Sequence, residues 1–157
     1  MIEIERKFLV LCDVYKKDAT TSYSIKQGFL NSHAERTVRV RLKKDIGILT
    51  IKGKSSEDGL SRYEWEKEIS FKDAEELFKL CEEWTIEKVR YEVKNGDHLF
   101  EIDEFFGENE GLVIAEIELN NENEYFEQPD WLGEEVTGDI RYYNSQLSKH
   151  PFRHWNK

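Results

Sequence analysis

Charged and apolar side chains alternate along much of the chain, beginning with its first ten residues, MIEIERKFLV. Successive side chains of a β-strand point to opposite faces. A strand over residues 2–10 therefore has a charged face and an apolar face, the first made of Glu3, Glu5 and Lys7 and the second of Ile2, Ile4, Phe8 and Val10. The same period of two recurs with β-branched and aromatic residues. It predicts strands over 2–10, 22–30, 36–43, 47–53, 61–70, 86–94, 98–106 and 112–119.

Short polar breaks separate these strands, among them the hairpin signal Asn95-Gly96. Connections this short favour antiparallel neighbours. Helical patterns interrupt the strands at 73–84, 122–128 and 139–149. Eight mostly antiparallel strands with few helices predict a closed barrel, so the fold is α+β and mainly β. No repeat, low-complexity tract or linker divides the sequence, and we expect a single domain over residues 1–157.

The charged faces of the predicted strands are not random mixtures of sign. Arg39 and Arg41 form a purely basic face, whereas Glu116 and Glu118 form a purely acidic one. An eight-stranded barrel has a lumen just wide enough for side chains or one small ligand. Around such a lumen, basic side chains would bind a polyanion, and carboxylates would hold a hard divalent cation such as Mg²⁺ or Mn²⁺. We therefore expect a charged lumen, with helices 73–84 and 139–149 covering the apolar outer faces.

Composition narrows the function classes. Charged residues make up 36% of the chain, against roughly 25% in typical soluble proteins. The net charge of −10 disfavours binding to nucleic acid or to anionic membranes. Cys12 and Cys81 are too few for a disulfide framework and lack metal-ligand spacing, so we expect reduced thiols in a cytoplasmic protein. The first predicted strand begins at residue 2, so we expect no signal peptide. No apolar run approaches the ~18 residues of a membrane span.

Seven segments in order along the chain resemble the triphosphate tunnel metalloenzyme (CYTH) family: MIEIERKFLV, TVRVR, LTIKG, YEWEKEI, EKVRY, FEIDEF and AEIEL. A single Glu-x-Glu-x-Lys motif is common by chance, but the ordered set spans residues 1 to about 145. The tail segment WLGEEVTGDIRYYN is similar to small bacterial members. The resemblance implies an eight-stranded antiparallel tunnel in which a linear triphosphate group is hydrolysed or cyclised with a divalent metal.

The resemblance also assigns roles to residues of the charged faces. Residues similar to the family's phosphate-binding set are Lys7, Arg39, Arg41, Lys52, Lys88 and Arg90. The acidic set implied to bind metal is Glu3, Glu5, Glu64, Glu66, Asp103, Glu116 and Glu118, with Glu64 the weakest member. The family's Gln-Gly-Tyr-Leu segment has Phe29 in place of tyrosine, so a role for that hydroxyl is lost. Arg141 lies where a terminal helix could add a basic residue.

The implied reaction is hydrolysis of inorganic tripolyphosphate to pyrophosphate and phosphate, with Mg²⁺ or Mn²⁺ as cofactor. Glu66 or Glu118 would orient or activate the attacking water, and Lys88 would assist the leaving phosphate. The alternatives are a class IV adenylate cyclase, a thiamine or nucleoside triphosphatase, and a non-enzymatic polyphosphate-binding module. We expect a small-molecule triphosphate as partner, with no nucleic acid and no membrane. Trp131 and Trp155 could cover the barrel or support a homodimer.

Overall fold

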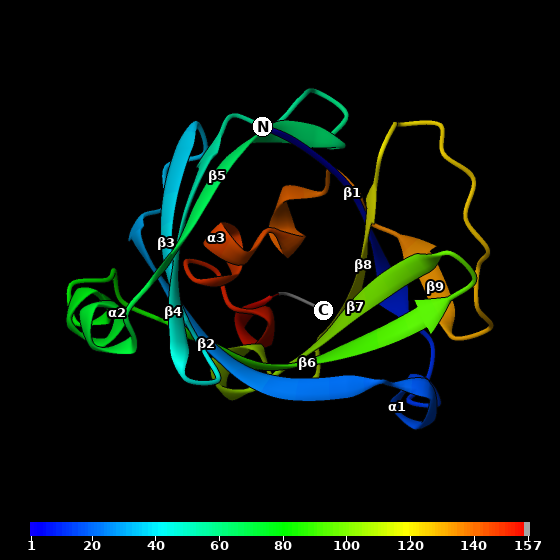
Figure 1. Cartoon of the computed structure of the whole chain (residues 1–157), viewed down its shortest axis with the longest axis horizontal. Helices are drawn as coiled ribbons and strands as arrows, with labels where there is room; N and C mark the ends of the chain where they lie inside the picture. The colour runs from blue at the N-terminus through cyan, green and yellow to red at the C-terminus, as the bar shows by residue number, and fades with distance from the viewer. Residues whose placement is uncertain (156–157) are drawn as a thin grey trace.

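A computed structural model describes residues 1–155 of the chain (Figure 1). The strands are β1 Ile2–Val10, β2 Thr21–Asn31, β3 Arg36–Lys43, β4 Ile46–Gly53, β5 Ser61–Ile69, β6 Ile86–Asn95, β7 His98–Phe105, β8 Val113–Leu119 and β9 Leu132–Glu135. The helices are α1 Tyr15–Asp18, α2 Phe71–Phe78 and α3 Asn144–Leu147, with 3₁₀ turns η1 Gly107–Asn109, η2 Ile140–Tyr142 and η3 Phe152–His154. Within the described residues, every helix is too short or too polar to cross a membrane.

The first eight strands close into an antiparallel barrel, as predicted. The sheet order is β5-β4-β3-β2-β6-β7-β8-β1-β9, and a second pairing of β1 with β5 completes the ring. β1 manages both contacts because its first half pairs with β5, through Glu3 opposite Arg62, while residues 4–9 pair with β8. The short strand β9, which the sequence analysis missed, pairs with the far end of β1 across a register shift at Phe8 and Val10. Four residues give too few alternations to predict a strand.

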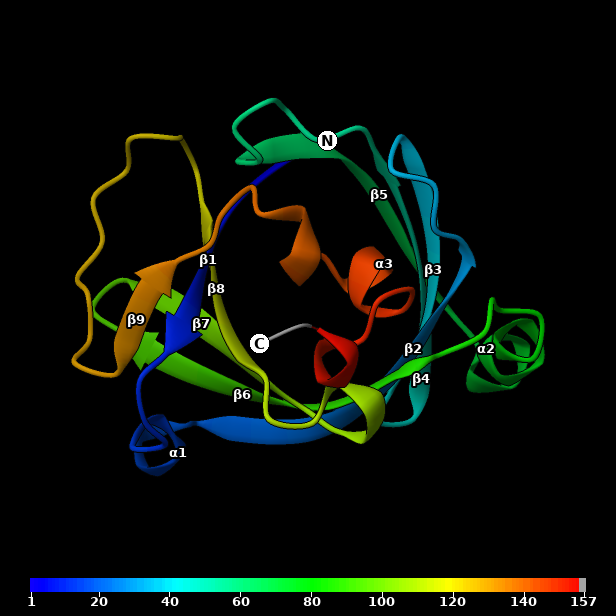
Figure 2. The same ribbon diagram turned by 180° about the vertical axis from the view of Figure 1, so that it is seen from behind.

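The largest apolar cluster of the protein lies on the outside of the barrel wall. It joins the outward side chains of β1, β6, β7 and β8 to α1 and to the segment 120–131: Phe8, Tyr15, Val93, Phe100, Ile102, Ala115, Ile117, Leu119, Phe126 and Trp131. Figure 2 shows this segment running along the outer side of the barrel between β8 and β9. The helix predicted over 122–128 is absent there. Asn121 and Glu124 accept hydrogen bonds from nearby backbone N–H groups, and such local bonds compete with helix formation.

Helix α2 covers a second part of the outer wall, over β2, β3 and β4 (Figure 1). Ser70 caps it by accepting a hydrogen bond from the Asp73 N–H group. A side chain at Gly47 would meet the Ala74 methyl at 2.3 Å, so the glycine permits this close approach. The helix ends before the predicted residue 84, because Glu82 instead binds Phe29 of β2 and Ser32 just after that strand. The Glu82 backbone N–H donates a hydrogen bond to the Phe29 carbonyl, and the Glu82 carboxylate accepts hydrogen bonds from the backbone N–H and the hydroxyl of Ser32.

The C-terminal segment lies inside one end of the barrel, not on its outer face (Figures 1 and 2). The predicted helix 139–149 is divided into η2 and α3 by the extended residue Tyr143. Its apolar side chains pack on the inward-facing ends of β1, β6, β7 and β8 in what we call the end cluster: Leu9, Ile86, Phe105, Leu112, Ile114, Val136, Tyr142, Leu147, Phe152 and Trp155. The inward faces thus change from charged to apolar at this end. The prediction was wrong because an apolar helical stripe does not reveal which side of a barrel it will meet.

We expect the outer cluster to contribute much of the stability of the barrel. The ring centroid of Phe126 lies 5.9 Å from that of Phe8 and 6.1 Å from that of Phe100. Phe126→Ala should lower the free energy of unfolding by about 3–5 kcal/mol, because it leaves a cavity under the covering segment. Urea denaturation measures this change. The control Tyr125→Ala, on the neighbouring residue with 81% exposure, should stay within about 0.5 kcal/mol. Equal effects would show that the segment does not cover a core.

Candidate active site

The charged strand faces enclose a cavity of about 210 Å³ inside the barrel. All residues that the sequence analysis assigned to phosphate or metal line this cavity except Asp103: Lys7, Arg39, Arg41, Lys52, Lys88 and Arg90, with Glu3, Glu5, Glu64, Glu66, Glu116 and Glu118. Several of the basic side chains are almost fully buried. Burying a charge costs several kcal/mol unless it is paired. The partners of each charged group therefore show which groups the protein itself compensates and which it leaves to a ligand.

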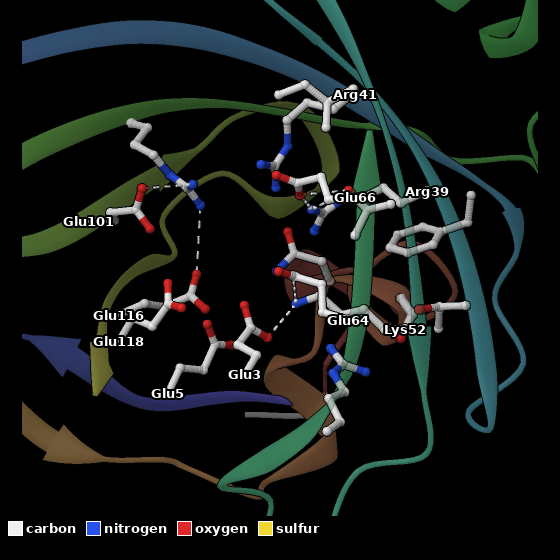
Figure 3. A pocket seen from close by; sticks show the side chains of 18 of the residues that line it. Glu3, Glu5, Arg39, Arg41, Lys52, Glu64, Glu66, Glu101, Glu116 and Glu118 are labelled. Carbon is white, nitrogen blue, oxygen red and sulfur yellow. Dashed lines mark hydrogen bonds and ion pairs between the residues drawn. The ribbon is translucent and has the colours of Figure 1, made fainter. Parts of the chain in front are cut away.

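Acidic and basic side chains are concentrated on different walls of the cavity (Figure 3). Glutamates gather where β1 and β8 lie side by side, and arginines face them from β3: Glu3, Glu5, Glu116 and Glu118 against Arg39 and Arg41. Strand register contributes to this separation at one point, since directly paired residues share a face. Glu5 stands opposite Glu118 in the β1–β8 pair. Like charges in such pairs repel one another, so each wall favours a ligand of the opposite sign.

Within residues 1–155, the arginines of the basic wall on β3 have no close carboxylate partner. Arg39 reaches Glu66 only at 3.9 Å and donates to the Thr50 hydroxyl at 3.3 Å. Its Nε atom is buried and has no hydrogen-bond partner in the part of the chain that the structure describes. Arg41 donates from Nε to the neutral side chain of Gln27 at 3.2 Å and forms no ion pair within residues 1–155. Burial lowers the pKa of Arg41 to about 9, and the charge of Arg39 adds to the effect. Both guanidinium groups are therefore available for an anion, and phosphate suits their bidentate geometry.

Lys88 and Arg90 on β6 are fixed by Asp103 on β7. The Lys88 ammonium lies 2.7 Å from Asp103 Oδ2, and Arg90 donates to both carboxylate oxygens, at 2.7 and 2.8 Å. Although burial opposes it, the charges of Arg90 and Lys88 lower the pKa of Asp103 to about 2. Burial lowers the pKa of Lys88 to about 7, even though Asp103 favours the ammonium form. Both oxygens of Asp103 are thus used within the protein, and this residue lies behind the cavity wall.

The acidic wall carries more negative charge than its neighbours compensate. Burial, together with the charge of Glu116, raises the pKa of Glu5 to about 8. Burial and the charge of Glu3 raise the pKa of Glu118. Glu116 differs: although burial opposes it, the charge of Lys7 lowers its pKa well below the usual range. The raised pKa values of Glu5 and Glu118 show that this part of the wall favours a bound proton or cation over free carboxylates, as closely spaced carboxylates do.

These carboxylates fit a hard divalent cation by their chemistry. The donors are all oxygens, and their excess negative charge is what Mg²⁺ or Mn²⁺ would neutralise. Lys52 takes up one of them in part, since its ammonium lies 2.8 Å from Glu3 and 3.4 Å from Glu64. Within residues 1–155, no three carboxylate, histidine or cysteine side chains are yet close enough together to hold a metal ion. Binding a cation would require the glutamates of this wall to draw together.

The cavity lining also contains residues that the sequence analysis did not assign to the site. Lys43, Arg62 and Glu101 come from the charged strand faces, and their alternation with apolar neighbours was a signal that could have found them. Phe29 lines the cavity as well. Asn144 and Ser145 enter from the C-terminal segment, and no charge pattern marks them.

Arg141 does not join the cavity, contrary to the possibility that a terminal helix adds a basic residue there. Its guanidinium is 62% exposed and lies 2.7 Å from Asp139. Asp139 also accepts a hydrogen bond from the Arg141 backbone N–H group and so caps the 3₁₀ turn η2. This pair therefore belongs to the turn that leads into the barrel.

Comparison with known proteins identifies the family. The CYTH domain model matches residues 1–149. The chain belongs to the CYTH domain family. This CYTH protein is 49% identical over 156 residues to an inorganic triphosphatase of Acetivibrio thermocellus, covering 99% of the chain and 98% of the relative. It is 38% identical over 152 residues to an inorganic triphosphatase of Nitrosomonas europaea, covering 94% and 97%.

A solved structure supports the same family. The crystal structure of the inorganic triphosphatase NE1496 matches this CYTH protein with a TM-score of 0.66 and 34% identity, covering 93% of this chain and 97% of that one. The family expected from the seven sequence motifs is therefore confirmed. The likeness extends over the whole barrel and the C-terminal segment up to the matched residue 149.

We expect Asp103 to stabilise the barrel of this CYTH protein by compensating Lys88 and Arg90. Asp103→Asn should lower the free energy of unfolding by about 3–5 kcal/mol, because two buried cations lose their partner. Denaturation in urea without phosphate or metal measures the change. In the control Glu76→Gln, which breaks an exposed pair with Lys79, the cost should be below about 1 kcal/mol. A cost below 1 kcal/mol for Asp103→Asn as well would contradict this role.

Proposed function

We propose that this CYTH protein hydrolyses inorganic tripolyphosphate to pyrophosphate and phosphate, with Mg²⁺ or Mn²⁺ as cofactor. The observation that carries the proposal is that the two walls of the cavity hold uncompensated charges of opposite sign. Within residues 1–155, Arg39 has only the distant Glu66 and Arg41 has no ion pair on one wall, while Glu5 and Glu118 form no ion pair on the other and have raised pKa values. A metal-bound triphosphate would satisfy both walls at once. Two relatives bearing the name inorganic triphosphatase support this substrate class.

The basic side chains would bind and orient the substrate. Arg39 and Arg41 would hold phosphate oxygens with their free N–H groups, and Arg90, fixed by Asp103, would stabilise charge that develops in the transition state. Lys7 and Lys52 would contact the remaining phosphate oxygens in exchange for their present partners Glu116 and Glu3. Preorganised donors in a buried cavity act more strongly than in water, because water does not screen them.

The acidic side chains would hold the metal and the attacking water. Glu3, Glu5, Glu116 and Glu118 are the proposed metal-binding residues, with Glu64 and Glu66 at the edge of the set. The bound cation would neutralise phosphate charge and so make the phosphorus atom more electrophilic. Asp103, which the resemblance placed in this set, has both oxygens on Lys88 and Arg90. We assign it to positioning those two cations.

The proposed reaction is a displacement by water at a terminal phosphorus atom. The water oxygen forms the new P–O bond, the phosphoanhydride bond breaks, and pyrophosphate leaves. Glu118 or Glu66 would orient the water and accept its proton. Lys88 would stabilise the negative charge on the leaving group, since its ammonium lines the cavity beside Arg90. A cytoplasmic location, in keeping with the free thiols of Cys12 and Cys81, is part of this proposal.

We expect phosphate release from tripolyphosphate to exceed release from ATP and thiamine triphosphate, with Mg²⁺ or with Mn²⁺. Most of the side chains that line the cavity are charged and match phosphate and metal. A parallel assay for cyclic AMP tests the cyclase alternative. A preference for ATP or thiamine triphosphate, or formation of cyclic AMP, would overturn the choice of substrate. Metal-independent tripolyphosphate binding without any turnover would favour the binding-module alternative.

Replacing a carboxylate of the acidic wall should weaken the use of metal. Glu118→Gln removes a donor that has no ion pair within the described residues, so its loss disturbs little else. We expect a fall in kcat of about 10²–10³-fold at fixed metal concentration, as for loss of one electrostatic contact to the transition state. We also expect a higher metal concentration for half-maximal activity. The control is Glu87→Gln. Glu87 lies on the outer face of β6, beside Lys26, so this variant should behave as wild type. Unchanged metal dependence in Glu118→Gln would remove it from the metal site.

A further inference from the structure

The side chain of Asn144 joins two parts of the basic lining that the barrel strands alone do not connect. Its Oδ1 atom accepts a hydrogen bond from the Lys88 ammonium at 3.0 Å and another from Gln27 Nε2 at 2.7 Å. Gln27 Oε1 in turn accepts from Arg41 Nε at 3.2 Å. Gln27 is fully buried, so water cannot replace either of its bonds. A continuous chain of hydrogen bonds therefore runs from Lys88 to Arg41.

The direction of every bond in this chain is determined by its ends. Lysine and arginine side chains can only donate hydrogen bonds. The atom of Asn144 that faces Lys88 must therefore be its oxygen, and the atom of Gln27 that faces Arg41 must also be an oxygen. Gln27 then presents its NH₂ group to Asn144, as the observed contact requires. Because each amide orientation is the only one that satisfies its neighbours, the chain is fixed in a single arrangement.

This chain restricts how Lys88 and Arg41 face the cavity. The Lys88 ammonium has three N–H donors, of which one points to Asp103 at 2.7 Å and one to Asn144 at 3.0 Å. The third donor has no hydrogen-bond partner within residues 1–155, and Lys88 lines the cavity, so this donor can bind a ligand there. Arg41 uses Nε for Gln27, and among the described residues its terminal N–H groups form no hydrogen bond. Asn144 itself lines the cavity, so its amide NH₂ group can donate to the same ligand.

We propose that Asn144 is a positioning residue for the proposed hydrolysis, which holds Lys88 directly and Arg41 through Gln27 in the orientation that the triphosphate requires. This inference rests on the proposed function for its substrate but not for its geometry. Asn144 owes its own position to the C-terminal segment. It is the first residue of α3, and Leu147, three residues further, is fully buried in the end cluster. The packing that closes one end of the barrel thus also supplies an acceptor to the phosphate site.

The test compares three substitutions at Asn144 with one control. Asn144→Ala removes the acceptor, Asn144→Leu removes it while keeping a side chain of similar size, and Asn144→Asp keeps an acceptor oxygen at the same place. Gln146→Ala changes a residue of the same helical turn that does not line the cavity. For each variant, kcat and KM for tripolyphosphate are measured at fixed metal concentration, together with urea denaturation. Calorimetry measures tripolyphosphate binding.

We expect kcat to fall about 10- to 100-fold in both Asn144→Ala and Asn144→Leu, the factor expected for loss of a hydrogen bond to a charged group. Asn144→Asp should recover most of kcat because its oxygen accepts the same bonds. Its KM should rise, since the added negative charge repels the substrate. Gln146→Ala should match wild type. This split between kcat and KM would not arise if Asn144 only stabilised the fold.

Two results would overturn the inference. The first is kcat within twofold of wild type in Asn144→Ala and Asn144→Leu. The second is an equal loss of kcat in Asn144→Asp and Asn144→Ala. If the wild-type protein itself releases no phosphate from tripolyphosphate, the proposed function fails, and the binding measurement decides the role of Asn144. In that case, binding weakened at least fivefold in Asn144→Leu but not in Gln146→Ala supports the positioning role, and unchanged binding refutes it.

Discussion

The burial of many charges in one barrel is the constraint on which the rest of this structure depends. A charged side chain inside a protein costs several kcal/mol unless a partner compensates it. The strands therefore cannot use their inner faces for an ordinary apolar core along their whole length. The apolar faces point outward, where α2 and the segment 120–131 cover them. At the end that receives the C-terminal segment, the inner faces of β1, β6, β7 and β8 become apolar.

Some charged side chains in the lumen have close partners of opposite charge, whereas others do not. Asp103 is shared between Lys88 and Arg90 at hydrogen-bond distance, so the protein itself supplies a partner to both cations. Arg39 and Arg41 receive only distant or neutral partners. Glu5 of β1 and Glu118 of β8 lie directly opposite one another in register. The uncompensated groups are therefore separated by sign, and a ligand that satisfies both walls must itself combine an anion with a cation.

The sequence predicted the features that depend on strand alternation. The period of two placed Glu3, Glu5 and Lys7 on one face, and antiparallel pairing brought that face together with the other charged ones. The features it missed depend on contacts between distant parts of the chain. Asn144 was assigned to an outer helix, because its neighbours Tyr142 and Leu147 look alike whether they pack inside or outside a barrel. Asp103 points to the same side of its strand as the residues that line the cavity. Its contacts with Lys88 and Arg90 nevertheless place it behind these two side chains.

The C-terminal segment makes stability and function interdependent at one end of the barrel. Leu147 and Tyr142 are held by apolar side chains from four strands, and Asn144 lies between them in sequence. Any loss of packing there would also move the acceptor that fixes Lys88 and Gln27. The outer cluster has no such link, since the barrel wall separates it from the cavity. Two apolar clusters of similar chemistry therefore have different roles. The outer cluster lowers the free energy of the closed barrel, and the end cluster sets the geometry of its charged lining.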